Sequence, residues 1–539
     1  MKLRAPAYPL ITIDPYMSVW SMGDRLNAGT VRHWTGRDMP LDGLADIDGE
    51  TYVFMGDAGR LGLPGMEQTS VEVEAFATRY RFEAGGVELT AEFLSPVLPD
   101  DLQLLSRPVS YLRTAVRTTD DGAHRVAVTV RASEAFCLNE PGQCPVFAER
   151  TNAAPGVTTM RLYGQEQAVL GKAGDDRRID WGYFYLSADG EREAGQMADP
   201  AGGDTQYVYV TAELDTAGEA QALFTFAYDD VYSLTYFGQP LKSVWNQDGM
   251  TIGAAIARAY AEYADVAARC RAFGEALTRE AAQAGGEEYA ELLLLALRQS
   301  VAAHKAAVDP EGKLLFVSKE CFSNGCAATV DVSYPSIPLF LLYNTELVKG
   351  MMRPIFRYAA QEKWPFDFAP HDVGTYPILN GQVYGGGTDP RWQMPVEECG
   401  NMLVMAAAVS AVDGNADFAG EYRELLTKWA AYLLRHGVDP ENQLCTDDFA
   451  GHLAHNCNLS LKAIMGLAGY ARLCGMWGDR QEAARFDAAA REMAASWLDR
   501  AAEGDGSFRL AFDQPGTFSM KYNAVWDKLF GTGLFPAAA

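Results

Sequence analysis

The sequence is poor in basic residues. Its 539 residues include 45 Lys and Arg but 71 Asp and Glu, which gives a net charge of −26. Proteins bind nucleic acids and anionic membranes through clustered Lys and Arg side chains. The composition therefore argues against both partners and favours a neutral or cationic small molecule as the substrate.

Apolar runs long enough to cross a membrane are also missing. No stretch approaches the roughly 18 apolar residues of a membrane span, and the opening MKLRAPAYPLITIDPY has no apolar stretch of signal-peptide length. The nine Cys are scattered without a CxxC pair, which favours reduced thiols over a disulfide framework. Together these absences predict a cytoplasmic protein.

Several motifs of nucleophiles and phosphate sites are absent. The chain has neither a GxSxG elbow nor a GxxxxGKS/T loop, and the three glycines at 385–387 follow no strand-to-helix pattern of the dinucleotide-binding type. Cys321 and Cys326 lie five residues apart but lack the partner pair that structural zinc sites usually have. We therefore expect no cofactor.

The first part of the chain is rich in β-strand signals. Up to about residue 235, short segments alternate apolar and polar residues and are separated by DG, GG or DDG turns. This pattern is typical of antiparallel hairpins, and many hairpins in series predict a β-sandwich. We place this N-terminal antiparallel β-sandwich at 1–245. Clear examples of the pattern are 46–56, 69–96, 110–133 and 205–215.

The spacing of the apolar residues changes after residue 245. From Ile252 to Leu277, apolar residues recur at three- and four-residue steps, which predicts one face of a long helix. We interpret 246–285 as a linker helix between two domains. Further helical stretches are predicted at about 287–307, 334–343, 345–361, 396–412, 415–436, 458–476, 479–502 and 519–530.

Helices in antiparallel succession form either a solenoid or a closed toroid of hairpins. No residue motif recurs at a fixed period, which counts against a solenoid. Several connections are long and rich in aromatic, acidic and amide residues, as is typical of the mouth of a toroid. We therefore predict a closed toroid of helical hairpins over 286–539, following the β domain.

Four loop regions of the helical part hold the residues suited to chemistry. They contain three of the seven His and two pairs of adjacent carboxylates. Since binding and catalytic residues concentrate on loops held by a rigid scaffold, we expect the active site there. The regions are 315–336, 364–387 continuing into 393–402, 444–460 and 512–530.

The two carboxylate pairs are the main candidates for acid–base catalysis. Glu397 and Glu398 follow Pro395 in a first helical turn, where the helix dipole favours the ionised form that a base or nucleophile needs. Asp447 and Asp448 precede two His and are the candidates for the proton donor. The structural alternatives are ordinary first-turn acids for the Glu pair and an N-cap for the Asp pair.

His371 and Asp372 lie in a Pro- and Gly-rich stretch that is too constrained for a helix and too polar for a buried strand. Trp364 and Tyr376 lie close by in the sequence. Aromatic faces with a few fixed polar groups are typical of a small-molecule pocket. We therefore assign Asp372 to the catalytic candidates and the other three to a substrate-facing wall, with a structural His–Asp pair as the alternative.

Further loop residues complete the predicted substrate site. His452 and His455 have an HxxH spacing that could ligate a divalent metal, but the HExxH form is missing. Contacts to backbone or substrate are therefore favoured for these two His, and no metal is expected. The other predicted substrate contacts are Lys319, Asp331, Asn456, Lys521 and Trp526.

Long runs spread over almost the whole chain are more specific than any short motif. They are PLITIDPYMSVWS (9–21), HWTGRDMPLDGLADIDGETYVFMG (33–56), AYDDVYSLTYFGQPLKSVW (227–245), DPEGKLLFVSKECFSNGCAATVDVSYPSIPLFLLYN (309–344), WPFDFAPHDVGTYPILNGQVYGGG (364–387), MPVEECGNML (394–403), DPENQLCTDDFAGHLAHNCNLSLKAI (439–464) and GTFSMKYNAVWDKLFGTGLFP (516–536). In these runs the chain resembles the glutaminase A family of fungi and bacteria. The resemblance implies an N-terminal β-sandwich and an (α/α)6-type helical toroid of the six-hairpin glycosidase type.

The resemblance also implies a hydrolase that acts on the side-chain amide of glutamine or a related small amide. A glycoside hydrolase using the same acidic pairs is the first alternative, and a non-catalytic carbohydrate or peptide binder is the second. A closed toroid of six hairpins needs twelve helices, whereas about eight or nine are predicted from residue 287 onward. We therefore expect either a toroid that is incomplete at the C-terminus or one that closes in another way.

Overall fold

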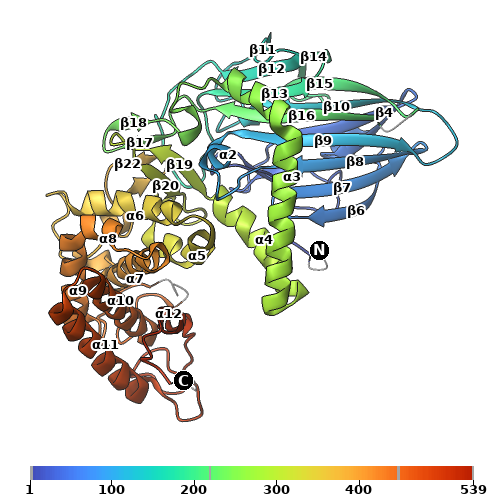
Figure 1. Ribbon diagram of the computed structural model, residues 1–539. Helices are drawn as coiled ribbons and strands as arrows, with labels where there is room; N and C mark the ends of the chain where they lie inside the picture. Colours follow the sequence, from blue (N-terminus) through green and yellow to red (C-terminus); the bar gives the residue numbers. More distant parts are fainter. Residues whose placement is uncertain (1–3, 218–219, 446–449, 537–539) are drawn as a thin grey trace. The chain divides into compact units, whose positions relative to one another are not determined.

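The computed structural model describes residues 4–217, 220–445 and 450–536 (Figure 1). These residues form two compact units. The first contains the chain up to Leu234 and Pro240–Val308, and the second contains Thr235–Gln239 and the chain from Asp309 on. The contacts divide the chain near residue 308, because the helices on either side of residue 285 pack with the strands.

The first unit is built from two large antiparallel sheets and a small third one. The strands of the large sheets are β4 (Leu41–Ile47), β5 (Glu50–Met55), β6 (Glu67–Val73), β7 (Ala77–Ala84), β8 (Val87–Leu94), β9 (Val109–Thr118), β10 (Arg125–Ser133), β11 (Val146–Thr151), β12 (Val157–Gly164), β13 (Tyr183–Asp189), β14 (Glu193–Ala198), β15 (Gln206–Asp215) and β16 (Ala220–Asp229). The third sheet consists of β1 (Tyr8–Thr12), β2 (Ser18–Ser21) and β3 (Arg32–His33). The short helical elements are α1 (Ala58–Leu61), α2 (Leu102–Ser106), η1 (Glu134–Phe136) and η2 (Val244–Asn246).

The two large sheets pack face to face. Their orders are β14-β15-β10-β4-β5 and β11-β12-β13-β16-β9-β8-β7-β6. Strands β12, β13 and β16 of the larger sheet contact β15 of the smaller one. Along β10 the alternating apolar residues are buried: Val128 pairs with Ala212 of β15, and both are 0% exposed. The predicted β-sandwich is confirmed.

The long helix α3 (Ile252–Gly285) packs against strands β9 and β16 (Figure 1). Its apolar face is the one that the spacing of the sequence predicts, and Tyr111 of β9 donates its hydroxyl hydrogen to the carbonyl of Ala259 at 3.1 Å. The next helix, α4 (Glu287–Ala302), is shorter than the predicted stretch 287–307. Residues His304–Val308 form strand β19 instead, because their backbone pairs with Lys242 and Ser243.

The second unit consists mainly of helices. They are α5 (Val330–Tyr343), α6 (Thr345–Ala359), α7 (Pro395–Asp413), α8 (Asp417–Glu421), α9 (Arg423–His436), α10 (Cys457–Met476), α11 (Arg480–Ala501) and α12 (Val525–Phe530). Its short elements are β20 (Leu314–Ser318), β21 (Gly374–Thr375), β22 (Ile378–Leu379), η3 (Tyr384–Gly386), η4 (Pro390–Trp392) and η6 (Tyr522–Ala524). Two further short strands, β17 (Leu234–Tyr236) and β18 (Gln239–Leu241), lie where the chain passes between the units. Most predicted helices are confirmed, but the one predicted over 415–436 is broken at Tyr422 into α8 and α9.

Helix α7 lies at the centre of the second unit. Its residues from Val396 to Ser410 are all buried, and it contacts α5, α6, α9 and α10. Two glycines let α7 and α10 approach closely, since a Cβ on Gly466 would lie 3.2 Å from the Cα of Gly400. This approach brings the first turn of α7 against Lys462 of α10.

The connection from α6 to α7 is the long Pro- and Gly-rich stretch that the sequence predicts as a loop. It contains only short strand and 3-10 segments, namely β21, β22, η3 and η4. Among the described residues, no helix combines the length and the apolar character needed to cross a membrane.

Candidate active site

Three side chains from separate elements meet in the second unit. Asp331 lies in the first turn of α5, His371 lies on the loop between α6 and α7, and Glu398 lies in the first turn of α7. One carboxylate oxygen or ring nitrogen of each lies within 4.8 Å of those of the other two. We call Asp331, His371 and Glu398 the carboxylate–histidine cluster.

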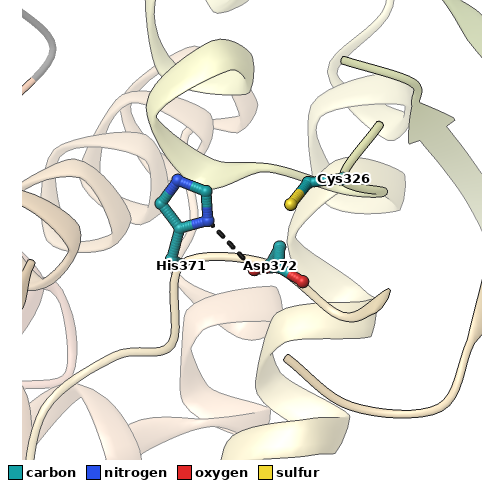
Figure 2. A group of neighbouring side chains, drawn as sticks. All are labelled: Cys326, His371 and Asp372. Carbon is teal, nitrogen blue, oxygen red and sulfur yellow. Dashed lines mark hydrogen bonds and ion pairs between the residues drawn. The ribbon is translucent and has the colours of Figure 1, made fainter. Parts of the chain in front are cut away.

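The imidazole of His371 is fixed between the loop and the cluster. Its Nδ1 lies 3.0 Å from Oδ2 of Asp372, and its ring stacks on Tyr384 with the centroids 4.2 Å apart. Figure 2 shows the other ring nitrogen directed away from both Asp372 and Cys326, and this Nε2 lies 3.6 Å from Oδ1 of Asp331. Burial lowers the pKa of His371, but the charges of Asp331 and Asp372 outweigh it and raise the pKa well above its ordinary value.

The carboxylate of Asp372 is fully engaged in the loop. Oδ1 accepts hydrogen bonds from the backbone N–H groups of Gly374 at 2.9 Å and Val383 at 3.0 Å, and Oδ2 accepts one from Tyr384 at 3.1 Å. The side chain is 0% exposed. Although the sequence suggests Asp372 as a catalytic group, these contacts favour a positioning role toward His371.

Glu398 is buried with one oxygen left without a partner. Its Oε2 accepts a hydrogen bond from Nδ2 of Asn401 at 3.0 Å, whereas Oε1 has no hydrogen-bond partner among the described residues. Burial raises the pKa of Glu398 well above its ordinary value, and the nearby charge of Asp331 adds to the rise.

Asp331 is the member of the cluster that solvent reaches most. Its side chain is 17% exposed, against 5% for that of His371. Its Oδ1 is buried and has no hydrogen-bond partner within the described part of the chain. Burial raises the pKa of Asp331 to about 6, although the charge of His371 opposes the rise. The sequence predicts this residue as a substrate contact, and its exposure fits that position.

Glu397 faces a different partner from its neighbour. Its carboxylate pairs with the ammonium of Lys462, and both side chains are 1% exposed. Nδ2 of Asn401 donates to Oε1 of Glu397 at 3.3 Å, and the ammonium lies 4.6 Å from the centre of the Tyr334 ring. Because its charge is already compensated, Glu397 is a weaker candidate for the base than the sequence suggests.

Three residues of this ion pair and its surroundings, Lys462, Tyr334 and Asn523, are not among the predicted site residues. Tyr334 donates its hydroxyl hydrogen to Oδ1 of Asn523 at 2.6 Å and accepts a hydrogen bond from the indole of Trp526 at 2.7 Å. One feature of the sequence predicts the role of Lys462. A single Lys within the apolar run LSLKAIMGL indicates a side chain that is buried with a partner. The predicted substrate contact Trp526 is 5% exposed and takes part in this packing.

Several predicted wall residues are part of the packed interior. The indole of Trp364 is buried and donates to the carbonyl of Phe368 at 2.8 Å. Tyr376 and Lys319 are each 1% exposed. The structure therefore gives Trp364 a packing role.

The two His of the HxxH stretch turn to different partners. His452 is exposed and lies edge-on against Trp392, with the centroids 5.3 Å apart. Nδ1 of His455 lies 2.8 Å from Oδ1 of Asp439. The other oxygen of this carboxylate, Oδ2, pairs with Arg500. Neither belongs to a group of metal-ligating side chains in the described part of the chain.

The remaining predicted contacts lie in local structure. Asn456 caps α10, since its Oδ1 accepts hydrogen bonds from the N–H groups of Asn458 and Leu459 at 2.9 and 3.0 Å. The ammonium of Lys521 lies 3.9 Å from the centre of the Phe508 ring. The predicted proton donors Asp447 and Asp448 lie outside the described residues.

The comparison with family models agrees with this architecture. The family model for the glutaminase A six helical-hairpin domain matches residues 286–539, and models for two domains of unknown function match 1–62 and 77–210. A bacterial glucoamylase complexed with acarbose is 9% identical with a TM-score of 0.45, over 92% of this chain and 67% of that structure. A family GH92 α-mannosidase from Bacteroides thetaiotaomicron is 14% identical with a TM-score of 0.41, over 95% and 66%. The chain spans about two thirds of the length of these structures. Similarity at these TM-scores does not indicate a shared function.

A curated relative covers nearly the whole sequence. Glutaminase A of Aspergillus oryzae is 29% identical over 575 residues, which is 99% of this chain and 82% of the relative. The match to the glutaminase A six helical-hairpin model and the relative named glutaminase A show that the protein is a hydrolase. More specifically, the chain belongs to the glutaminase A family.

Proposed function

We propose that the protein hydrolyses the side-chain amide of glutamine, or of a related small amide, to a carboxylate and ammonia. Glutaminase activity is the property for which the Aspergillus oryzae relative is named, and that relative aligns with 99% of this chain. The geometry that supports the proposal best is the carboxylate–histidine cluster, in which two carboxyl groups with unpartnered oxygens face one imidazole nitrogen.

The cluster offers separate positions for the two halves of the reaction. Amide hydrolysis needs a group that takes a proton from water and a group that protonates the leaving nitrogen. Asp331 is the more exposed carboxyl and is placed to meet water and substrate. Glu398 is fully buried, and its Oε1 has no hydrogen-bond partner among the described residues. His371 lies with both and is held in one orientation by Asp372.

The site holds more carboxyl groups than cationic side chains, which suits the proposed substrate. Asp331 and Glu398 bring two carboxyl groups to the site, while Glu397 is neutralised by Lys462. The α-ammonium of free glutamine would be attracted to such a site.

Glycoside hydrolysis is the second candidate, because the separation of two carboxyl groups in the site also fits it. Retaining glycosidases place two carboxyl groups about 5–5.5 Å apart, and inverting ones about 6.5–9.5 Å apart. The facing oxygens of Asp331 and Glu398 lie within 4.8 Å of each other. A glycosidase built on this pair would therefore be of the retaining type.

One parallel assay separates the two candidates. Ammonia release from L-glutamine and nitrophenol release from a panel of nitrophenyl glycosides are measured with the wild type, Asp331→Asn and Glu398→Gln. Asp487→Asn is the matched control, because Asp487 lies on α11 in an exposed pair with Arg491. We expect ammonia release by the wild type and the control, and a loss of at least about 100-fold in kcat in both cluster variants, the lower end of a general acid–base contribution. Sugar release with no ammonia would favour the glycosidase, and full activity in both cluster variants would refute this site.

A further inference from the structure

We propose that the carboxylate–histidine cluster binds one divalent transition-metal ion through Oδ1 of Asp331, Nε2 of His371 and Oε1 of Glu398. This inference deepens the proposed function, since the ion would serve the same hydrolysis, but the binding itself stands on the geometry alone.

The donor set and its spacing suit such an ion. Zinc and related ions bind His nitrogen and carboxylate oxygen at roughly 2.0–2.2 Å, so two ligand atoms on one ion lie at most about 4.4 Å apart. One donor atom of each of the three side chains already lies within 4.8 Å of those of the other two. Small side-chain shifts would bring such atoms to a common ion.

The two carboxylate oxygens lack any other partner in the described structure. Oδ1 of Asp331 and Oε1 of Glu398 are both inaccessible to solvent and accept no hydrogen bond, and Glu398 is 0% exposed. Leaving a buried acceptor unsatisfied costs roughly 1–3 kcal/mol, and more for a charged group. A cation placed between the oxygens would compensate both of them.

The surroundings of the donors resemble those of metal ligands. A metal-binding His usually donates its second ring N–H to a carboxylate, which fixes its orientation. His371 places Nδ1 3.0 Å from Asp372, and Asp372 is itself held by three backbone N–H groups. The second oxygen of Glu398 is held by Asn401. The outer-shell contacts of His371 and Glu398 are thus in place before any ion is bound.

A second group, formed by Cys326, His371 and Asp372, also has close donor atoms, but it is less suited to an ion. Both oxygens of Asp372 already accept hydrogen bonds. Burial raises the pKa of the Cys326 thiol to about 12, whereas the thiolate is the form that binds metal. Figure 2 shows this thiol beside Asp372, away from the ring nitrogen that faces the cluster.

The ion would supply a positive charge for the reaction, which the carboxyl groups alone do not. Amide hydrolysis develops negative charge on the carbonyl oxygen, and a bound divalent ion stabilises that charge and lowers the pKa of its water. The second oxygen of Asp331 takes a proton from that water, and the hydroxide forms a bond to the amide carbon. The C–N bond then breaks, and the proton passes from Asp331 to the leaving nitrogen, which gives a carboxylic acid and ammonia; the acid then transfers its proton to ammonia.

The test uses the full-length chain after removal of metal by a chelator and dialysis. Zn²⁺ is titrated by calorimetry, and Co²⁺ is followed by its visible absorption. We expect one ion per chain, with visible Co²⁺ bands from nitrogen and oxygen ligands. Loss of an outer-shell partner typically weakens binding by about 10–100-fold. Asp372→Asn should show that loss, and Asp331→Asn and Glu398→Gln should show at least as much, while Asp487→Asn should bind as the wild type does.

The possible results distinguish a failure of the metal site from a failure of the proposed function. Equal binding of Zn²⁺ by the wild type and by both ligand variants, with unchanged melting temperatures, would overturn the site. Binding of one ion without ammonia release from glutamine would leave the site standing and remove the proposed function. Undiminished ammonia release by the metal-free chain would overturn the catalytic use of the ion and retain the hydrolysis.

Discussion

Replacing Lys462 by Met should destabilise the second unit strongly. The ammonium of Lys462 pairs with the carboxylate of Glu397, and each side chain is 1% exposed. Met has nearly the shape of the Lys side chain but no charge, so the substitution fills the space and leaves the carboxylate buried without its cation. It also removes the cation that lies over the ring of Tyr334.

The size of the effect follows from this burial. Breaking a buried ion pair by removal of one partner costs roughly 3–5 kcal/mol, because the remaining charge stays desolvated. We therefore expect Lys462→Met to lose about 3–5 kcal/mol in the free energy of unfolding. The double variant Lys462→Met with Glu397→Gln should recover most of this loss, since no uncompensated charge remains.

The measurement is urea-induced unfolding followed by far-UV circular dichroism and tryptophan fluorescence, with the transitions of the two units fitted separately. The Glu397→Gln single variant completes the double-mutant cycle. A loss below about 1 kcal/mol in Lys462→Met, the range of an exposed pair, would refute the reasoning. So would a double variant no more stable than Lys462→Met alone.

Three further predictions concern pH, helix packing and the loop at the site. Burial lowers the pKa of His304 to about 4. As the pH is lowered from 6.5 to 4, the unfolded chain therefore binds a proton that the folded chain does not bind, and the free energy of unfolding should fall by up to roughly 3.4 kcal/mol at 1.36 kcal/mol per pKa unit. The variant His304→Gln should show a flatter stability profile in thermal melts from pH 4 to 7. Gly400→Ala should lower the melting temperature, because the new Cβ would lie 2.7 Å from Cγ of Lys462, whereas Gly475→Ala meets nothing within 4 Å and should stabilise its helix by up to about 1 kcal/mol; equal melting temperatures would contradict the close packing of α7 and α10. Asp372→Asn should lower kcat for amide hydrolysis by at least about tenfold with little change in KM, because His371 loses its orientation, and an unchanged kcat would exclude the positioning role.

The sequence carries most of the information on secondary structure. Alternation with a period of two predicts the strands of the sandwich, and the three- and four-residue spacing from Ile252 onward predicts α3. Local pattern fails where a tertiary contact decides the conformation. Residues His304–Val308 leave the predicted helix because their backbone pairs with the chain near Ser243, and the helix predicted over 415–436 breaks at Tyr422.

The candidate site was only partly visible in the sequence. The spacing of Glu397 and Glu398 in a first helical turn identified the right element, but the two side chains look identical in the sequence. In the fold, residues on adjacent positions of a helix point about 100° apart, so that Glu397 meets Lys462 while Glu398 meets Asp331 and His371.

The sequence by itself determined the order of the two architectures and the acidic, aromatic loops of the helical part, because composition and periodicity are local properties of the chain. Only the tertiary structure decided which of those loop residues act together. Trp364 packs into the interior, whereas Asp331 and His371, 40 positions apart in the sequence, come within 3.6 Å of each other. Their meeting depends on how α5, α7 and the intervening loop pack, and no local pattern encodes that contact.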